Sequence, residues 1–96
     1  MIPTAALATS PAIDPMFDLI EAHRKAHAAH MASLELQARL EKTHRASEVS
    51  WVSTKPCHDD NATFDAFIAA PATTLPGLLA KLAYLQDLRA ILRLSG

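Results

Sequence analysis

Residues 14–34 read DPMFDLIEAHRKAHAAHMASL, and this stretch decides the fold class because it carries the start and the apolar stripe of a long helix. The Asp14 carboxylate can accept hydrogen bonds from the free amides of a first helical turn, and Pro15 has the fixed φ that suits the first helical position. From there to about Glu48 the chain contains neither proline nor glycine. These signals predict one helix over about 15–47.

One face of this predicted helix is apolar when each residue is rotated by about 100° from the one before it. The residues that fall within about 80° of His23 are Met16, Leu19, Ile20, His27, His30, Met31, Leu34 and Ala38. We therefore expect this face to be buried, with three histidines on it, and expect the apolar stripe to fade after Ala38.

The second half of the chain predicts two shorter helices. Residues 47–60 mix β-branched residues, serines and a proline, which is typical of a loop, and we expect Trp51 in it to cover one end of the core. A second helix is predicted over about 60–70, ended by Pro71, because a proline disfavours the helical conformation of the residue before it. A third helix is predicted over about 74–94.

The third predicted helix has clear start signals. Thr73 or Thr74 can cap it, and Pro76 falls in the first turn, where no amide hydrogen bond is lost. The sequence as a whole therefore predicts an all-α fold in which the long amphipathic helix packs antiparallel against a C-terminal helix-loop-helix. We expect residues 1–13, broken by two prolines, to form a disordered tail, and residues 14–96 to form a single helical domain.

Composition narrows the possible functions. The chain has 96 residues, half of them apolar, with 5% aromatic residues and two glycines, so the glycine-rich nucleotide-binding loops are excluded. Nine Lys and Arg stand against ten Asp and Glu, and the clearest basic group, Lys81, Arg89 and Arg93, is too small to follow a phosphate backbone. A lone cysteine, Cys57, fits a reducing compartment, and no run is long enough to span a membrane, so we expect a cytoplasmic protein.

Leucines cover an unusually wide arc of the third predicted helix. Leu75, Leu78, Leu82, Leu85 and Leu92 form one seam, and Tyr84, Leu88 and Ile91 form a second on a neighbouring face. A helix that is apolar over so wide an arc needs more than one covering surface, and we expect another protomer or a helical partner protein to supply one. The predicted interface residues are Leu78, Leu82, Tyr84, Leu85, Leu88, Ile91 and Leu92.

The stretch HRKAHAAH at 23–30 raises the question of a metal site. His23 with His27, or His27 with His30, could bind one transition-metal ion if Cys57, His58 or Asp59 completed the ligand set. All three histidines are not expected on one ion, because residues seven apart are separated by about 10.5 Å along a helix. The alternatives are that the rings pack along a helix seam with ordinary hydrogen bonds, or that they form a pH-sensing cluster.

Two stretches together resemble the signatures of a group of short bacterial helical proteins of unknown activity. DPMFDLIEAHRKAH at 14–27 is similar to an Asp-Pro helix with Ile-Glu-x-His-Arg, and PATTLPGLLAKLAYL at 71–85 to a Pro-x-Thr-Thr-Leu-x-Gly helix with a tyrosine. The matching residues are Asp14, Pro15, Ile20, Glu21, His23, Arg24, Pro71, Thr73, Thr74, Leu75, Gly77 and Tyr84. The resemblance implies a helical fold and no particular activity, and it implies packing positions at 27 and 30–31, where such proteins carry aromatic residues.

The sequence thus favours a small non-enzymatic interaction or assembly module that self-associates through the last helix. A transition-metal-binding or pH-sensing helical protein that uses His23, His27 and His30 is the alternative, and a small DNA-associated regulator is a second. No cofactor is expected. A short helical chain also offers little room for a closed pocket with convergent polar groups, so we do not expect an enzyme.

Overall fold

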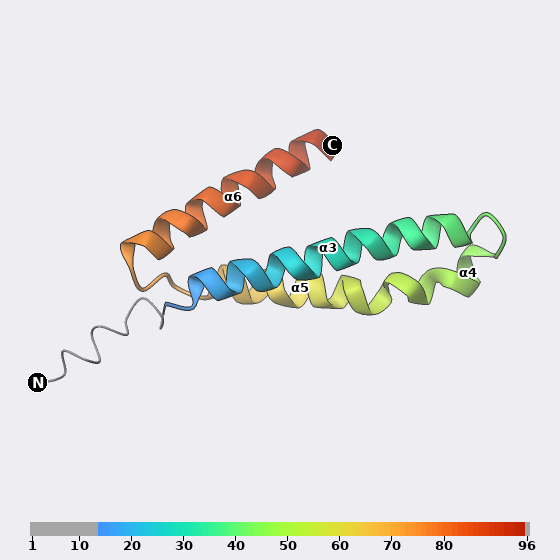
Figure 1. The fold of residues 1–96 in the computed structure, drawn as a ribbon, viewed down its shortest axis with the longest axis horizontal. Coiled ribbons are helices and arrows are strands. Elements are labelled where there is room, and N and C mark those ends of the chain that lie inside the picture. The colour runs from blue at the N-terminus through green and yellow to red at the C-terminus, as the bar shows by residue number, and fades with distance from the viewer. Residues whose placement is uncertain (1–13, 96) are drawn as a thin grey trace, which may run out of the picture. The chain divides into compact units, whose positions relative to one another are not determined.

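A computed structural model of the chain describes residues 14–95, with side chains to Ile91, and every regular element in that range is helical. The elements are helix α3 (Met16–Leu40), helix α4 (Ala46–Val49), the 3₁₀ helix η1 (Ser50–Ser53), helix α5 (Thr54–Ala69) and helix α6 (Leu75–Ser95) (Figure 1). The predicted all-α fold class is therefore confirmed for these residues. None of their helices is long and apolar enough to cross a membrane.

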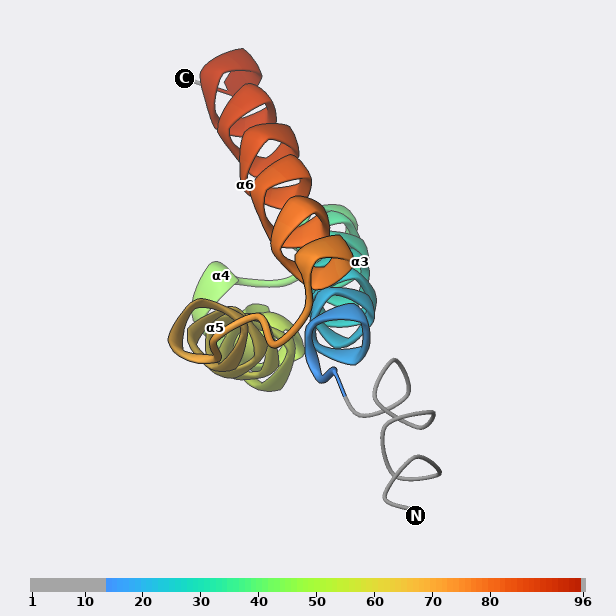
Figure 2. The same cartoon turned by 90° about the vertical axis from the view of Figure 1, so that its left-hand side faces the viewer.

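The chain divides into two compact units. Glu21–Ala69 forms the hairpin unit, and the described parts of Met1–Ile20 and Ala70–Gly96 form the terminal unit. Within the hairpin unit the chain runs out along α3, turns, and returns along α5, so that the two helices lie antiparallel and side by side (Figures 1 and 2). The single domain over 14–96 stays a prediction, and the predicted tail over 1–13 lies outside the described residues.

The terminal unit is organised around the Asp14 carboxylate, which is 3% exposed. Its Oδ1 atom accepts a hydrogen bond from the Met16 amide at 3.0 Å, which confirms Asp14 as a cap of α3. The Thr74 hydroxyl donates to Oδ2 and in turn accepts from the Gly77 amide at 3.0 Å, so that Thr74 caps α6. The hydrogen bond from Thr74, followed by that from Met16, holds the pKa of Asp14 below its usual value.

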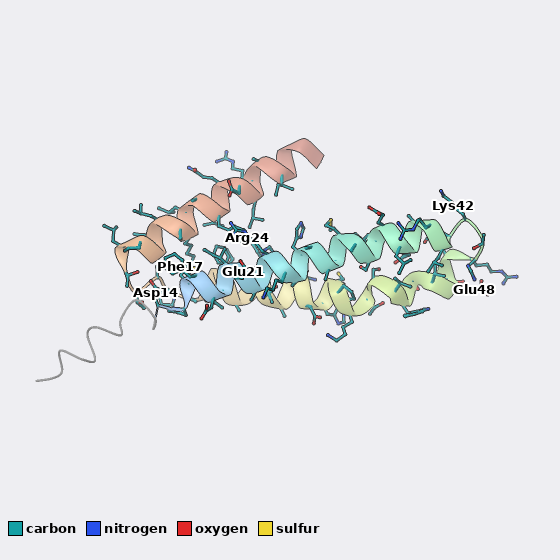
Figure 3. All side chains as sticks on the ribbon, in the orientation of Figure 1. Asp14, Phe17, Glu21, Arg24, Lys42 and Glu48 are labelled. Carbon is teal, nitrogen blue, oxygen red and sulfur yellow. The ribbon has the colours of Figure 1, made fainter. Side chains whose placement is uncertain are left out.

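The first predicted helix is too long, because α3 ends at Leu40 and not near residue 47. The Leu40 carbonyl accepts hydrogen bonds from the amides of Thr43 and His44 at 3.0 and 2.9 Å, so the last turn is satisfied without a glycine or proline. Lys42 and Glu48 lie around this turn, at the closed end of the hairpin (Figure 3). No sequence signal marked the turn, and the structure corrects the expected boundary.

The predicted loop over 47–60 is also wrong, since α4, η1 and the first half of α5 occupy it. Helix α5 begins at Thr54 and not near residue 60. Pro56 is its third residue and therefore lies in the first turn, where the missing amide has no helical partner to lose. Trp51 does not cover the core as expected, because it is 71% exposed.

The expected buried face of α3 holds only in its first half. Met16, Ile20 and His23 are 0, 6 and 3% exposed, whereas Met31 and Leu34 are 43 and 40% exposed. Farther along, Gln37 is half-buried, and its Oε1 accepts a 2.6 Å hydrogen bond from Ser53 of η1. Polar side chains therefore continue the contact face of α3 where its apolar stripe fades.

We predict that Gly77→Ala destabilises the protein, although glycine to alanine in a helix is ordinarily stabilising by up to about 1 kcal/mol. A Cβ atom at position 77 would lie 2.1 Å from Asp14 Oδ2 and would displace the carboxylate that caps α3. We expect a loss of about 1–2 kcal/mol in the free energy of unfolding, measured by urea denaturation. In an Asp14→Ala background the same change should be neutral or stabilising, and a loss of equal size in both backgrounds would contradict this explanation.

Candidate functional site

Three histidines of α3 converge on one carboxylate of α5. His23 Nε2 lies 2.8 Å from Asp60 Oδ1, while His27 Nδ1 and His30 Nδ1 lie 2.9 and 2.8 Å from Asp60 Oδ2. These contacts join residues 37, 33 and 30 positions apart in the sequence. We call the four residues the histidine–aspartate cluster.

The helices position the cluster by simple periodicity. Spacings of four and three residues place the three rings on one face of α3, which is the face that meets α5. Asp60 lies on the same face of α5 as Phe64 and Phe67, at the same two spacings. The Phe64 ring is 5.4 Å from the His23 ring, centroid to centroid, and closes one side of the cluster with an apolar surface.

The cluster is mostly shielded from water. His23 is 3% and Asp60 is 9% exposed, and the His30 side chain is 17% exposed, whereas the His27 side chain, at 35%, offers a route to solvent. Burial by itself raises the pKa of Asp60, but hydrogen bonds from His30, His27 and His23 outweigh burial and lower it. Asp60 is therefore an ionised carboxylate in a largely buried place, and the imidazoles compensate its charge.

The residues expected to complete a metal site from the middle of the chain do not join the cluster. Cys57 accepts a weak hydrogen bond from Asn61 at 3.8 Å, and His58 is exposed. Asp59 forms an ion pair with Lys55 at 2.8 Å on the outer surface of α5. Asp60 supplies the carboxylate instead.

Asp60 was not among the candidate ligands identified from the sequence, because the second helix was predicted to begin at about residue 60. Helix α5 already extends six residues before it, so Asp60 lies inside the helix, and its side chain faces α3. The spacing of Asp60, Phe64 and Phe67 was the available signal: a lone carboxylate in register with two aromatic residues indicates a buried acid once the helix covers all three positions.

A second candidate surface lies on α6, where the predicted interface residues are found. Leu78, Leu82 and Ile91 are 44, 50 and 49% exposed. Leu85 and Leu88 are half-buried, and the side chain of Leu92 lies outside the described residues. Tyr84 differs from the expectation, since it is 6% exposed and belongs to the core of the terminal unit.

Comparison with known proteins adds no relative. Neither the protein-family models nor the searches of curated proteins and solved structures give a match to this chain. The function therefore has to be inferred from the residues themselves.

We predict that Asp60→Asn lowers the free energy of unfolding by about 2–4 kcal/mol at pH 7, because three imidazoles lose their charged partner. Since the pKa of Asp60 is lowered in the folded state, its contribution is complete above the unfolded value of about 3.9 and is lost as pH falls through the lower folded value. Urea denaturation between pH 7 and pH 3 should show that the free energies of unfolding of the wild type and of Asp60→Asn converge at the acidic end.

The matched control is Asp59→Asn, one position earlier on the same helix. Its ion pair with Lys55 is exposed to solvent. Removing it should therefore lower the free energy of unfolding by less than about 0.5 kcal/mol. A similar loss of stability in both variants would contradict the special role of Asp60.

Proposed function

We propose that this protein is a small, non-enzymatic helical assembly module that self-associates through α6. The supporting observation is the distribution of large apolar side chains among the described residues: five are buried and eleven are exposed. A small folded chain ordinarily keeps such side chains inside, and a contiguous exposed patch marks an interaction surface.

The exposed leucines of α6 form one continuous stripe. Leu75, Leu78, Leu79 and Leu82 are 67, 44, 58 and 50% exposed and follow the spacing of one helix face. We call these four residues the α6 stripe. Burying a fully exposed leucine contributes about 1.5–3 kcal/mol, and because these leucines are already about half covered, each would contribute roughly half of that to association.

A second copy of the chain is the partner we propose. A stripe of four leucines is complementary to itself, since two copies related by a two-fold axis bury the same residues on both sides. Arg89 is exposed farther along α6, where it gives the predicted interface a polar edge. A helical partner of different sequence would use the same stripe and would leave the isolated chain monomeric.

We expect the full chain to sediment as a dimer or larger species at micromolar concentration, with a dissociation constant that Leu82→Glu raises by at least tenfold. The charge introduced by the substitution would have to be desolvated in the interface. Analytical ultracentrifugation over a concentration series measures both quantities.

Leu36→Glu is the matched control, since it adds the same charge at an exposed leucine of α3 that is 41% exposed and outside the stripe. It should leave the association unchanged. A wild-type chain that remains monomeric to 100 micromolar, or equal weakening by the two variants, would refute self-association through α6.

A further inference from the structure

The histidine–aspartate cluster contains a donor set that suits a transition-metal ion. The ligating atoms of His23, His27 and Asp60 all lie within 4.8 Å of one another. His23 and His27 are one turn apart on α3, with ring centroids 5.7 Å apart, and Asp60 faces them from α5. We propose that these three residues bind one divalent transition-metal ion, with Zn²⁺, Co²⁺ and Ni²⁺ as the matching class.

The chemistry of the donors selects this class. Two imidazole nitrogens and one carboxylate oxygen are the mixed nitrogen and oxygen donors that Zn²⁺ and its neighbours prefer, whereas Mg²⁺ and Ca²⁺ require oxygen donors. With neutral imidazoles the three ligands carry a net charge of −1, so a divalent ion leaves the site with a charge of +1. Without the ion, hydrogen bonds compensate the charge of Asp60; a bound ion would take over that role.

The distances indicate how the ion would enter. The nitrogen to oxygen separations of 2.8 and 2.9 Å are those of hydrogen bonds. Two ligands of a tetrahedral ion with bonds of about 2.0–2.1 Å lie about 3.3 Å apart. Binding therefore requires the ion to displace protons and the side chains to separate by about half an ångström, which small rotations of the partly exposed His27 and of Asp60 would supply.

His30 has a different role in this proposal. Its ring bonds to Asp60 Oδ2 at 2.8 Å, but it does not belong to the group of atoms that approach one point. A hydrogen bond from His30 to the ligating carboxylate would fix the orientation of Asp60, as outer partners commonly do for metal ligands. Three protein ligands leave a coordination position for water, on the side where His27 is 35% exposed.

The test uses the full chain, free of any polyhistidine tag and treated with a chelator. Co²⁺ is added while visible absorption is followed, and Zn²⁺ is added while the melting temperature is followed, with Mg²⁺ as a negative control. We expect one Co²⁺ per chain with absorption bands of nitrogen and oxygen coordination, and a melting temperature that rises with Zn²⁺ and not with Mg²⁺.

Variants separate a built site from ordinary surface histidines. His27→Ala removes a partly exposed ligand and should weaken Co²⁺ binding by at least 100-fold, whereas His30→Ala should weaken it by about 10–100-fold. The control is His58→Ala, because His58 is exposed on α5 and outside the cluster, and this variant should bind as the wild type does. Circular dichroism establishes that each variant is folded before metal is added.

The proposal is overturned if the wild type shows neither Co²⁺ absorption nor a Zn²⁺-dependent rise in melting temperature at 100 micromolar metal. It is also overturned if His27→Ala binds as tightly as the wild type, or if His58→Ala weakens binding as much as His27→Ala does. If His27→Ala fails to fold, the pair of His30→Ala and His58→Ala decides, because only the former should lose affinity.

Discussion

The hairpin unit depends on the placement of one carboxylate, Asp60, between two helices. An ionised group that is 9% exposed is costly unless it is compensated, and the three imidazoles of α3 provide that compensation through three hydrogen bonds of 2.8, 2.9 and 2.8 Å. Because these bonds are directional, they also fix how α3 and α5 are aligned along their length. Sliding one helix by a single turn would take at least one of the three imidazoles out of reach of Asp60, so the cluster favours one register of the hairpin.

A second carboxylate organises the terminal unit by the same principle. Asp14 caps α3 through the Met16 amide and receives the hydroxyl of Thr74, which itself caps α6. Gly77 leaves the space that the carboxylate occupies, since a Cβ atom there would overlap it. Two segments about sixty residues apart are thus joined by capping groups that also satisfy the free amides of two helix starts.

The distribution of polar and apolar residues connects the two proposals. The contact between α3 and α5 uses histidines, Gln37 and Asp60 where many helical hairpins use leucine, while the four leucines of the α6 stripe are exposed. Polar hydrogen bonds give the hairpin a defined alignment, and exposed apolar surface would provide the free energy for the proposed association. Because the cluster belongs to the hairpin unit and the α6 stripe to the terminal unit, separate substitutions should alter the proposed metal binding and the proposed self-association.

The sequence by itself determined the all-α class, the starts of α3 and α6, and the end of α5 before Pro71, because each follows from interactions within about one helical turn. It also placed His23, His27 and His30 on one face. It did not determine the turn after Leu40, which no glycine or proline marks, or the helix around Pro56, a residue that suits a loop and a first turn equally. Only the tertiary structure brought Asp60 to the histidines and buried Tyr84. Contacts between residues 30 or more positions apart depend on how the folded chain turns back on itself. Local periodicity describes neighbours within a few residues and carries no information about such distant contacts.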